Sequence, residues 1–336
     1  RAMVSVLGST HHEVIARHQD IAAVFPDVVW HAERPLLRTG PAPLFLLSRL
    51  VRDNGLKVVL TGEGSDEVLG GYDIFREAKV RRFWARHPES TLRPRLFERL
   101  YPYLTRSPAA ARGMALSFWR KGLDTPDDPM FSHGPRWSSA QGLMRYFSRD
   151  WRARTAAAPD PVAALRAELP ANFSRWDPLA QAQYLEMVTL LAPYLLSSQG
   201  DRMLMGNSVE GRFPFLDREV MALANSLPPS FKLKVLDEKH VLKRVARGLV
   251  TDEILKRPKQ PYRAPDALSF IGTTRPGWVD DAMSETALKT SGVFAPGPVG
   301  ALWKKCLTRA NDDQFSNTDN MAVVGILSTQ LVHQQQ

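Results

Sequence analysis

Cysteine is almost absent from this sequence, because Cys306 is the single one among 336 residues. One cysteine cannot form a disulfide within the chain, which excludes a disulfide-stapled fold and favours a reducing compartment, the cytoplasm. Long apolar runs are missing too: no stretch of about 18 apolar residues is available to span a membrane, and nothing resembles a signal peptide. The sequence therefore predicts a cytoplasmic globular protein with no membrane partner.

Clusters of metal-ligating or nucleophilic residues are also scarce. The neighbours His11 and His12 would point to opposite faces of a strand, so they do not predict a metal site. Neither a zinc-type spacing nor a Ser–His–Asp spacing is present. These absences argue against a zinc enzyme and against a serine hydrolase.

Charge is plentiful and mostly positive. Lys and Arg number 44 against 35 Asp and Glu, for a net charge of +9, and such a field attracts polyanions. The densest basic group, 76–86 (REAKVRRFWAR), distributes its charges around a predicted helix, which indicates a solvated face more than a nucleic-acid groove. We therefore do not expect nucleic acid as a partner, and the positive charge also suits an enzyme that handles ATP and pyrophosphate.

The first 85 residues alternate helical and strand-like patterns. We expect the end of a helix at 2–7 and a short strand at 9–15. Another helix is predicted at 43–52 and ends at Asn54-Gly55, since both residues tolerate a left-handed backbone. Its expected core-facing residues are Leu44, Leu47, Leu50 and Val51.

A short apolar run at 57–60 (KVVL) follows that helix end. Continuous β-branched runs of this length are typical of strands buried on both faces of a parallel sheet. Helix, turn, strand, loop and helix in this order indicate an α/β fold.

Helical patterns dominate beyond about residue 85. One helix is predicted to begin at Asp177-Pro178, with Asp as its cap, and others to cover 238–249 and 321–331. The stretches 121–137 and 258–276 are rich in Pro, Gly and charge and are predicted as loops.

This pattern divides the chain into the remainder of an α/β unit, 1–85, and a helical extension, 86–336. Since the sequence starts at Arg1 and not at a methionine, we expect that an N-terminal portion is absent.

The strongest chemical signal lies in 57–72, KVVLTGEGSDEVLGGY. Gly62 and Gly64 follow the predicted strand, at the end where α/β sheets usually bind ligands. Without a Cβ, they let backbone amides approach a nucleotide. Glu63 and Asp66 flank the bend, so both carboxylates are able to face one crevice. Such a pair suits Mg²⁺ on phosphate oxygens or a cationic amine.

A purely structural interpretation of these acids stays open. Ser65 or Asp66 would cap the helix that follows, and Glu67 would interact with its dipole from the first turn. Glycine beside acids is common in turns that bind nothing, so the loop alone is a weak indicator.

Taken whole, the segment resembles the SGEGSDExxGGY signature of the glutamine-dependent asparagine synthetases, with Thr61 in place of the usual Ser. Further stretches resemble other motifs of that family in the same order: Asp201-Arg202, then 208–217 (SVEGRFPFLD), then Lys239-His240 and 257–260 (RPKQ). The resemblance spans about residues 8–262, and the tail beyond about 275 is not placed by it.

The resemblance implies an α/β domain of the nucleotide α-hydrolase type, with part of a parallel sheet and a large, mainly helical extension. It implies an enzyme that uses ATP and Mg²⁺ to adenylate the β-carboxylate of aspartate. Ammonia derived from glutamine then attacks, which gives asparagine, AMP and pyrophosphate. A glutaminase domain is implied as the partner, and a homodimer is left open.

Roles for individual residues follow from the same resemblance. The catalytic residues that it implies are Glu63 at the reacting carboxylate and ammonia, Asp66, which also binds Mg²⁺, and Lys259 at the leaving pyrophosphate. Lysines and Mg²⁺ suit this chemistry, because charge develops on phosphate oxygens. Glu210 and Arg212 are expected to form a structural ion pair under the site. The implied nucleotide-binding and phosphate-binding residues are Thr61, Gly62, Gly64, Ser65 and Lys239.

Two departures from the family pattern matter. Its SGGxDS phosphate loop, which would supply a second Mg²⁺ ligand, does not occur in this sequence. The glutaminase nucleophile, an N-terminal cysteine, is also missing, and Cys306 lies too far downstream to replace it. We therefore expect no synthetase activity from this chain by itself. Two alternatives stay open: a relative that adenylates another carboxylate, as β-lactam-forming or peptide-amidating members do, and a non-catalytic remnant.

Overall fold

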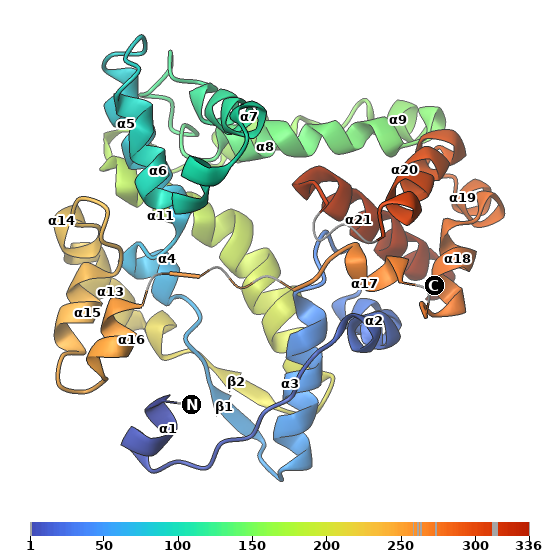
Figure 1. The fold of residues 1–336 in the computed structure, drawn as a ribbon, viewed down its shortest axis with the longest axis horizontal. Coiled ribbons are helices and arrows are strands. Elements are labelled where there is room, and N and C mark those ends of the chain that lie inside the picture. Colours follow the sequence, from blue (N-terminus) through green and yellow to red (C-terminus); the bar gives the residue numbers. More distant parts are fainter. Residues whose placement is uncertain are drawn as a thin grey trace.

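The computed structural model describes residues 2–257, 259–260, 262, 264–272, 274–310 and 315–335. Within these ranges the fold is mainly helical, with one small parallel sheet of two strands (Figure 1). β1 (Val58–Leu60) pairs with β2 (Glu210–Arg212), and Val59 lies opposite Gly211. The expected α/β class is confirmed, whereas the nucleotide α-hydrolase topology stays a prediction.

The run 57–60 contains a strand, but its expected burial on both faces is wrong. Val58 is 44% exposed and Leu60 is 73% exposed, although both side chains are apolar. A strand is buried on both faces only where helices cover both sides of its sheet, and the described helices leave β1 largely uncovered. The apolar run identifies the strand, while its neighbours decide its burial.

The N-terminal segment is partly as expected. α1 (Ala2–Leu7) is the predicted helix end, and Gly8 follows it with a φ of 59°. The strand expected at 9–15 is wrong, because residues 9–17 form neither helix nor strand. A strand needs a partner for its backbone hydrogen bonds, and this segment pairs with no strand in the described part of the chain.

α2 (His18–Ala32) was not indicated by sequence patterns. It buries Ile21, Phe25 and Val28 although Pro26 lies inside it. A proline is unfavourable within a helix because it lacks an N–H, so the buried apolar face outweighs a local breaker signal here.

α3 (Pro41–Asp53) confirms the helix predicted at 43–52, but its buried face differs from the predicted one. Phe45 and Ser48 are buried, whereas Leu47 is 43% exposed. Ser48 Oγ donates to the carbonyl of Met203 at 2.8 Å, which holds this face against α12 (Arg202–Met205). A buried hydroxyl needs such a partner, so polar pairing as well as apolar spacing set the inward face.

α4 (Ser65–Leu69) and α5 (Asp73–Ala85) lead from the sheet into a group of short helices (Figure 1). The further elements of this group are η1 (Arg93–Arg95), α6 (Leu96–Leu100), η2 (Pro102–Arg106), α7 (Ala109–Arg120), α8 (Gly134–Ala140), η3 (Gln141–Tyr146), α9 (Arg149–Thr155), α10 (Pro161–Ala167) and η4 (Phe173–Arg175).

The basic group 76–86 lies on α5 and its C-cap residue Arg86, close to the prediction, but the expected solvated face is wrong for Arg81. This side chain is 2% exposed and donates to the carbonyls of Trp119, Lys121 and Phe131. Its five N–H groups in a planar fork suit such multiple bonding. A buried guanidinium thus fastens α5 to the end of α7 and the loop after it.

A long helical rod crosses the molecule. α11 (Pro178–Glu186) begins as predicted, since Asp177 Oδ1 accepts a hydrogen bond from Leu179 N at 2.8 Å. α11 continues into η5 (Met187–Asp201), a π-helix, and then into α12. This rod contacts α3 and β2 and so positions the sheet.

The C-terminal third is helical. β2 is followed by η6 (Pro214–Leu216), α13 (Arg218–Ser226), α14 (Pro229–Lys232), α15 (His240–Val245), α16 (Asp252–Lys256), α17 (Leu268–Ile271), α18 (Gly277–Met283), α19 (Glu285–Ser291), α20 (Pro296–Thr308) and α21 (Asn317–Gln335). The helices predicted at 238–249 and 321–331 are confirmed, with shorter and longer bounds respectively.

The two predicted loops need a small correction. In 121–137, α8 already begins at Gly134. In 258–276, the helix α17 occupies 268–271, and the positions 258, 261, 263 and 273 lie outside the described residues.

The largest apolar core joins α2 and α3 to α17–α21, and α2 lies between α3 and the pair α17 and α21, with contacts to all three (Figure 1). Leu36 N also donates to Ser328 Oγ at 2.9 Å. Residues on both sides of position 85 thus share one core, and the division at that position stays a prediction. Among the described residues, no helix is both long and apolar enough to traverse a bilayer.

Candidate functional site

The site lies where the chain bends from β1 into α4. Gly64 occupies the N-cap position with a φ of 87°, and a Cβ on it would overlap the side chain of Leu216. Only glycine suits both constraints. The expectation that Ser65 or Asp66 caps this helix is wrong, because no side chain caps it. The Asp66 carboxylate instead bonds to lysines.

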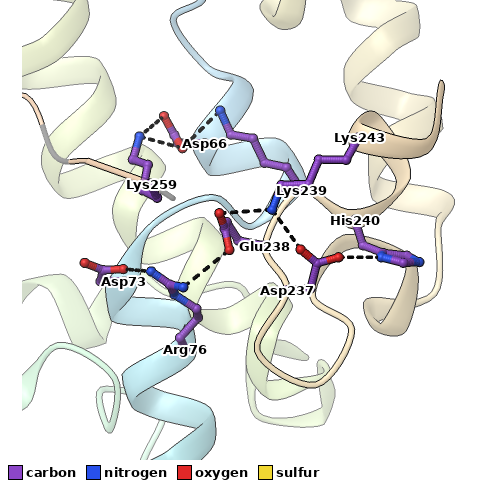
Figure 2. A network of polar contacts seen from close by, with 9 residues as sticks. All are labelled: Asp66, Asp73, Arg76, Asp237, Glu238, Lys239, His240, Lys243 and Lys259. Carbon is purple, nitrogen blue, oxygen red and sulfur yellow. Dashed lines mark hydrogen bonds and ion pairs between the residues drawn. The ribbon is translucent and has the colours of Figure 1, made fainter. Parts of the chain in front are cut away.

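Two lysines converge on that carboxylate (Figure 2). Lys259 Nζ donates to Asp66 Oδ1 at 3.0 Å and to Oδ2 at 2.9 Å. Lys239 Nζ lies 3.0 Å from Oδ1 and donates to Ser65 Oγ at 2.8 Å. The three charged side chains are each about one fifth exposed, so solvent and ligands reach them. The structure therefore brings together four of the predicted site residues.

Backbone geometry admits this close approach. Gly71 follows α4, and a Cβ there would overlap Asp66 Oδ1 and Lys239 Cε. Lys239 itself has a φ of 48°, in the left-handed region that costs a residue with a Cβ roughly 1–2 kcal/mol. Such strain persists only where the surrounding structure imposes it, and it is common at functional sites.

The remaining predicted residues occupy the loop just before α4. Gly62 is exposed, and a Cβ on it would meet no atom within 4 Å. Thr61 Oγ1 accepts a hydrogen bond from Glu63 N at 3.4 Å. Burial, and then the charge of Asp66, raise the pKa of Glu63, while Lys259 and Lys239 lower it. The loop therefore offers open backbone beside a carboxyl group that is partly shielded from water.

Two further residues belong to the site. From the sequence, Glu67 was expected only to interact with the helix dipole, and Tyr72 was given no role. Glu67 is 1% exposed, and burial raises its pKa to about 7. The Tyr72 hydroxyl donates to Glu67 Oε1 at 2.9 Å, and Lys259 Nζ lies 5.4 Å from the centre of the Tyr72 ring. Both residues lie in the signature segment 57–72, and their place in it is the one sequence feature that could have indicated a role at the site.

A second charged network supports the segment that carries Lys239 (Figure 2). Glu238 accepts from Arg76 Nη1 at 3.3 Å and from Lys243 Nζ at 3.1 Å. Lys243 Nζ also donates to Asp237 at 2.7 Å. The network ties the residues just before Lys239 to α5 and α15. Sequence patterns gave no sign of its link to α5, because Arg76 lies 162 residues before Glu238.

The outlying predictions are simple to place. Glu210 and Arg212 form the expected ion pair at 2.8 Å, but both are more than half exposed, so the pair contributes little stability. His11 and His12 lie in the exposed segment after α1.

The site has the right donors for a polyanion. Its two ammonium groups and its open glycine loop suit phosphate oxygens. Among the described residues, no cluster of three His, Cys, Asp or Glu side chains forms an all-protein metal cage. Mg²⁺ seldom uses one, because it is usually held by one or two carboxylates together with substrate phosphates, and Asp66 fits that role.

Comparison with known proteins gives a consistent result. The family model of asparagine synthase matches residues 1–334. The chain is 31% identical over 274 residues to a putative glutamine-hydrolysing asparagine synthetase of Mycobacterium tuberculosis, covering 79% of this chain and 38% of that protein. It is 26% identical over 264 residues to glutamine-hydrolysing asparagine synthetase 1 of Bacillus subtilis, covering 78% and 39%.

A differently named relative is similarly close. The chain is 30% identical over 281 residues to amidase chyE of Penicillium rubens, covering 79% of this chain and 40% of that protein. The chain thus spans about two fifths of the length of these relatives.

Proposed function

The chain belongs to the asparagine synthase family, and we propose that it supplies the ATP-dependent half of an amide synthesis. In this reaction a carboxylate displaces pyrophosphate from ATP to form an acyl-adenylate. Ammonia then displaces AMP to form the amide. The observation that carries the proposal is the convergence of Lys239 and Lys259 on Asp66 beside the open loop at Gly62.

The two lysines are suited to the leaving pyrophosphate. Negative charge grows on its oxygens as the bond to the α-phosphorus breaks, and fixed ammonium groups stabilise that charge. Asp66 would hold Mg²⁺, which supplies further neutralisation of the phosphates when bound. Ser65, which already bonds to Lys239, keeps that lysine directed at the same place.

Glu63 is suited to the second half of the reaction. Its pKa is raised by burial, which makes its carboxylate a better proton acceptor. A carboxylate beside the loop is able to take a proton from ammonia as the amide forms. We assign this role to Glu63 and nucleotide contacts to Thr61, Gly62 and Gly64.

Aspartate is the carboxylate that we propose first, with asparagine as product and glutamine as the source of ammonia through a glutaminase domain. The alternative is a related reaction on another carboxylate, and the similarity to a relative named as an amidase supports this alternative. The site residues above are common to both, since they act on phosphate and ammonia and not on the rest of the substrate.

The first test is binding of magnesium pyrophosphate to the chain, measured by titration calorimetry. Lys239→Ala and Lys259→Ala should each weaken binding about tenfold, as expected for losing a charge-assisted contact. Lys289→Ala is the matched control, because Lys289 is 67% exposed on α19 and pairs only with Glu285 in the described contacts. Equal affinity in all variants would contradict the proposal.

The second test is turnover in a protein that joins this chain to a complete phosphate loop and a glutaminase domain. Lys259→Ala should lower kcat more than it raises KM for ATP, because charge on the leaving group is greatest in the transition state. Glu63→Gln should abolish amide formation with little change in thermal stability. The chain alone should release no pyrophosphate above background from ATP, aspartate and ammonia.

A further inference from the structure

α4 carries two neighbouring carboxylates that bind different partners. Asp66 contacts the lysines of the site. Glu67 is buried against the protein interior, where Gln183 Nε2 donates to its backbone carbonyl. A buried carboxylate is costly unless its oxygens are bonded, yet Glu67 Oε2 has no hydrogen-bond partner among the described residues. Stability alone therefore gives a poor reason for an acid at this position.

The bonded oxygen of Glu67 leads back to the site through Tyr72. α4 ends at Gly70, which has a φ of 70°, and the hydroxyl of Tyr72, two residues further on, reaches Glu67 Oε1. Burial raises the pKa of Tyr72 far above its usual range, so this hydroxyl stays a donor. The ring packs near Phe75, with 6.0 Å between ring centres.

The face of the Tyr72 ring is turned to the ammonium of Lys259, with 5.4 Å between Nζ and the ring centre. A cation within about 6 Å of an aromatic face is attracted to it. Lys259 therefore has two attachments to the α4 region, one direct through Asp66 and one through the ring that Glu67 orients. Lys239 differs, because its contacts in the described structure are with Asp66 and Ser65.

We propose that Glu67 and Tyr72 are positioning residues that hold Lys259 at the site together with Asp66, and continue to hold it when Asp66 releases it. A phosphate ligand competes with Asp66 for the ammonium groups, and a cation on Asp66 competes with the lysines. The aromatic contact competes with neither, because it uses no carboxylate oxygen. The identity of the anion rests on the proposed function, while the positioning of Lys259 does not.

Selective chemical labelling of the ligand-free chain tests the positioning. A brief pulse of an amine-acylating reagent, read by mass spectrometry, measures the exposure of each lysine. Tyr72→Leu should raise the labelling rate of Lys259 severalfold and leave that of Lys239 within about twofold of wild type. A merely structural role for Tyr72 would change both lysines together, and that result, or an unchanged Lys259, would overturn the proposal.

Milder variants separate the contribution of the Tyr72 ring from that of its hydrogen bond to Glu67. Glu67→Leu removes the acceptor for the Tyr72 hydroxyl and should raise Lys259 labelling, whereas Glu67→Gln keeps an acceptor oxygen and should restore it. Tyr72→Phe keeps the ring without the hydrogen bond to Glu67, and its labelling rate at Lys259 should lie between those of wild type and Tyr72→Leu. Circular dichroism identifies any variant that fails to fold, and the two milder variants then decide the outcome.

Binding of magnesium pyrophosphate adds a double-mutant cycle. Tyr72→Leu should weaken binding about threefold to thirtyfold, the range that a cation–π contact corresponds to. Added to Lys259→Met, Tyr72→Leu should weaken pyrophosphate binding no further, whereas added to Lys239→Met it should weaken binding by its full factor. Additive effects with both lysines would overturn the proposal. If pyrophosphate does not bind at all while labelling remains selective, the proposed function fails and the positioning stands.

Discussion

Lys239 Nζ and Lys259 Nζ lie at the same distance, 3.0 Å, from a single atom, Asp66 Oδ1. Two like charges are thereby held close together, and the shared carboxylate compensates their repulsion. The lysines come from segments on either side of α16, so the pairing depends on Asp66 and not on local chain geometry. Asp66 therefore competes with anions for the two lysines, and it is also a candidate metal ligand.

Replacing that carboxylate should separate the two roles. Asp66→Asn removes the anion that competes for the lysines, so metal-free pyrophosphate should bind about threefold to tenfold more tightly. In the presence of Mg²⁺ the same variant should bind pyrophosphate more weakly than wild type, because a cation ligand is lost. Calorimetry with and without Mg²⁺ provides the measurement, and a loss of affinity in both conditions would rule out competition between Asp66 and pyrophosphate for the lysines.

Gly71→Ala should disturb the site more than the fold. The added methyl group overlaps Asp66 Oδ1 and Lys239 Cε, and these flexible ends move apart at a modest cost in stability. Pyrophosphate affinity should therefore fall about tenfold, while thermal unfolding shifts little. Gly113→Ala at an exposed position of α7 is the control: no atom lies within 4 Å of its Cβ, and it should stabilise the protein by about 0.5–1 kcal/mol. A Gly71→Ala protein with wild-type affinity would show that the lysines are not held so closely.

Arg81→Met should destabilise the protein strongly without acting on the site. The substitution leaves the carbonyls of Trp119, Lys121 and Phe131 without their shared donor, at a cost of about 3–5 kcal/mol. Arg86→Met, on the exposed end of the same segment, should change stability by no more than about 0.5 kcal/mol. Urea unfolding of both variants measures the difference, and equal midpoints would refute the interpretation of Arg81 as a fastening residue.

Cys306 should report on unfolding and on alkaline pH. Its thiol is fully buried, and burial raises its pKa to about 11 from 9.0. The unfolded thiol therefore ionises first, so the stability that this group contributes is complete below pH 9 and is lost as pH rises toward 11. The stability difference between wild type and Cys306→Ala should shrink over that interval. Thiol labelling at pH 8 should be slow and should accelerate in urea, and fast labelling of the native chain would contradict this burial.

Several elements were predictable because they depend on neighbours in the sequence. The cap at Asp177, the stop at Gly55 and the glycines around Glu63 act through local backbone conformation, and the structure bears out the first two directly. The signature segment was recognisable for the same reason, since one short loop holds most of the site. Lys239 and Lys259 were assigned by resemblance, and only the structure brings them to Asp66.

Other features required neighbours that no local pattern reveals. Leu47 and Leu60 are apolar yet exposed, and Arg81 is charged yet buried, because burial depends on what lies opposite in space. The expected strand at 9–15 is wrong because a strand exists only with a partner.

The amino-acid sequence by itself determined the family, the composition of the loop from Thr61 to Ser65, the start of α11 and the approximate positions of α15 and α21, since these rest on contiguous residues. Only the tertiary structure decided that two distant lysines share one oxygen of Asp66, and that Glu67 reaches Lys259 through the ring of Tyr72. The reason is physical: charge pairing and aromatic contact act over a few ångströms of space, whatever the separation along the chain.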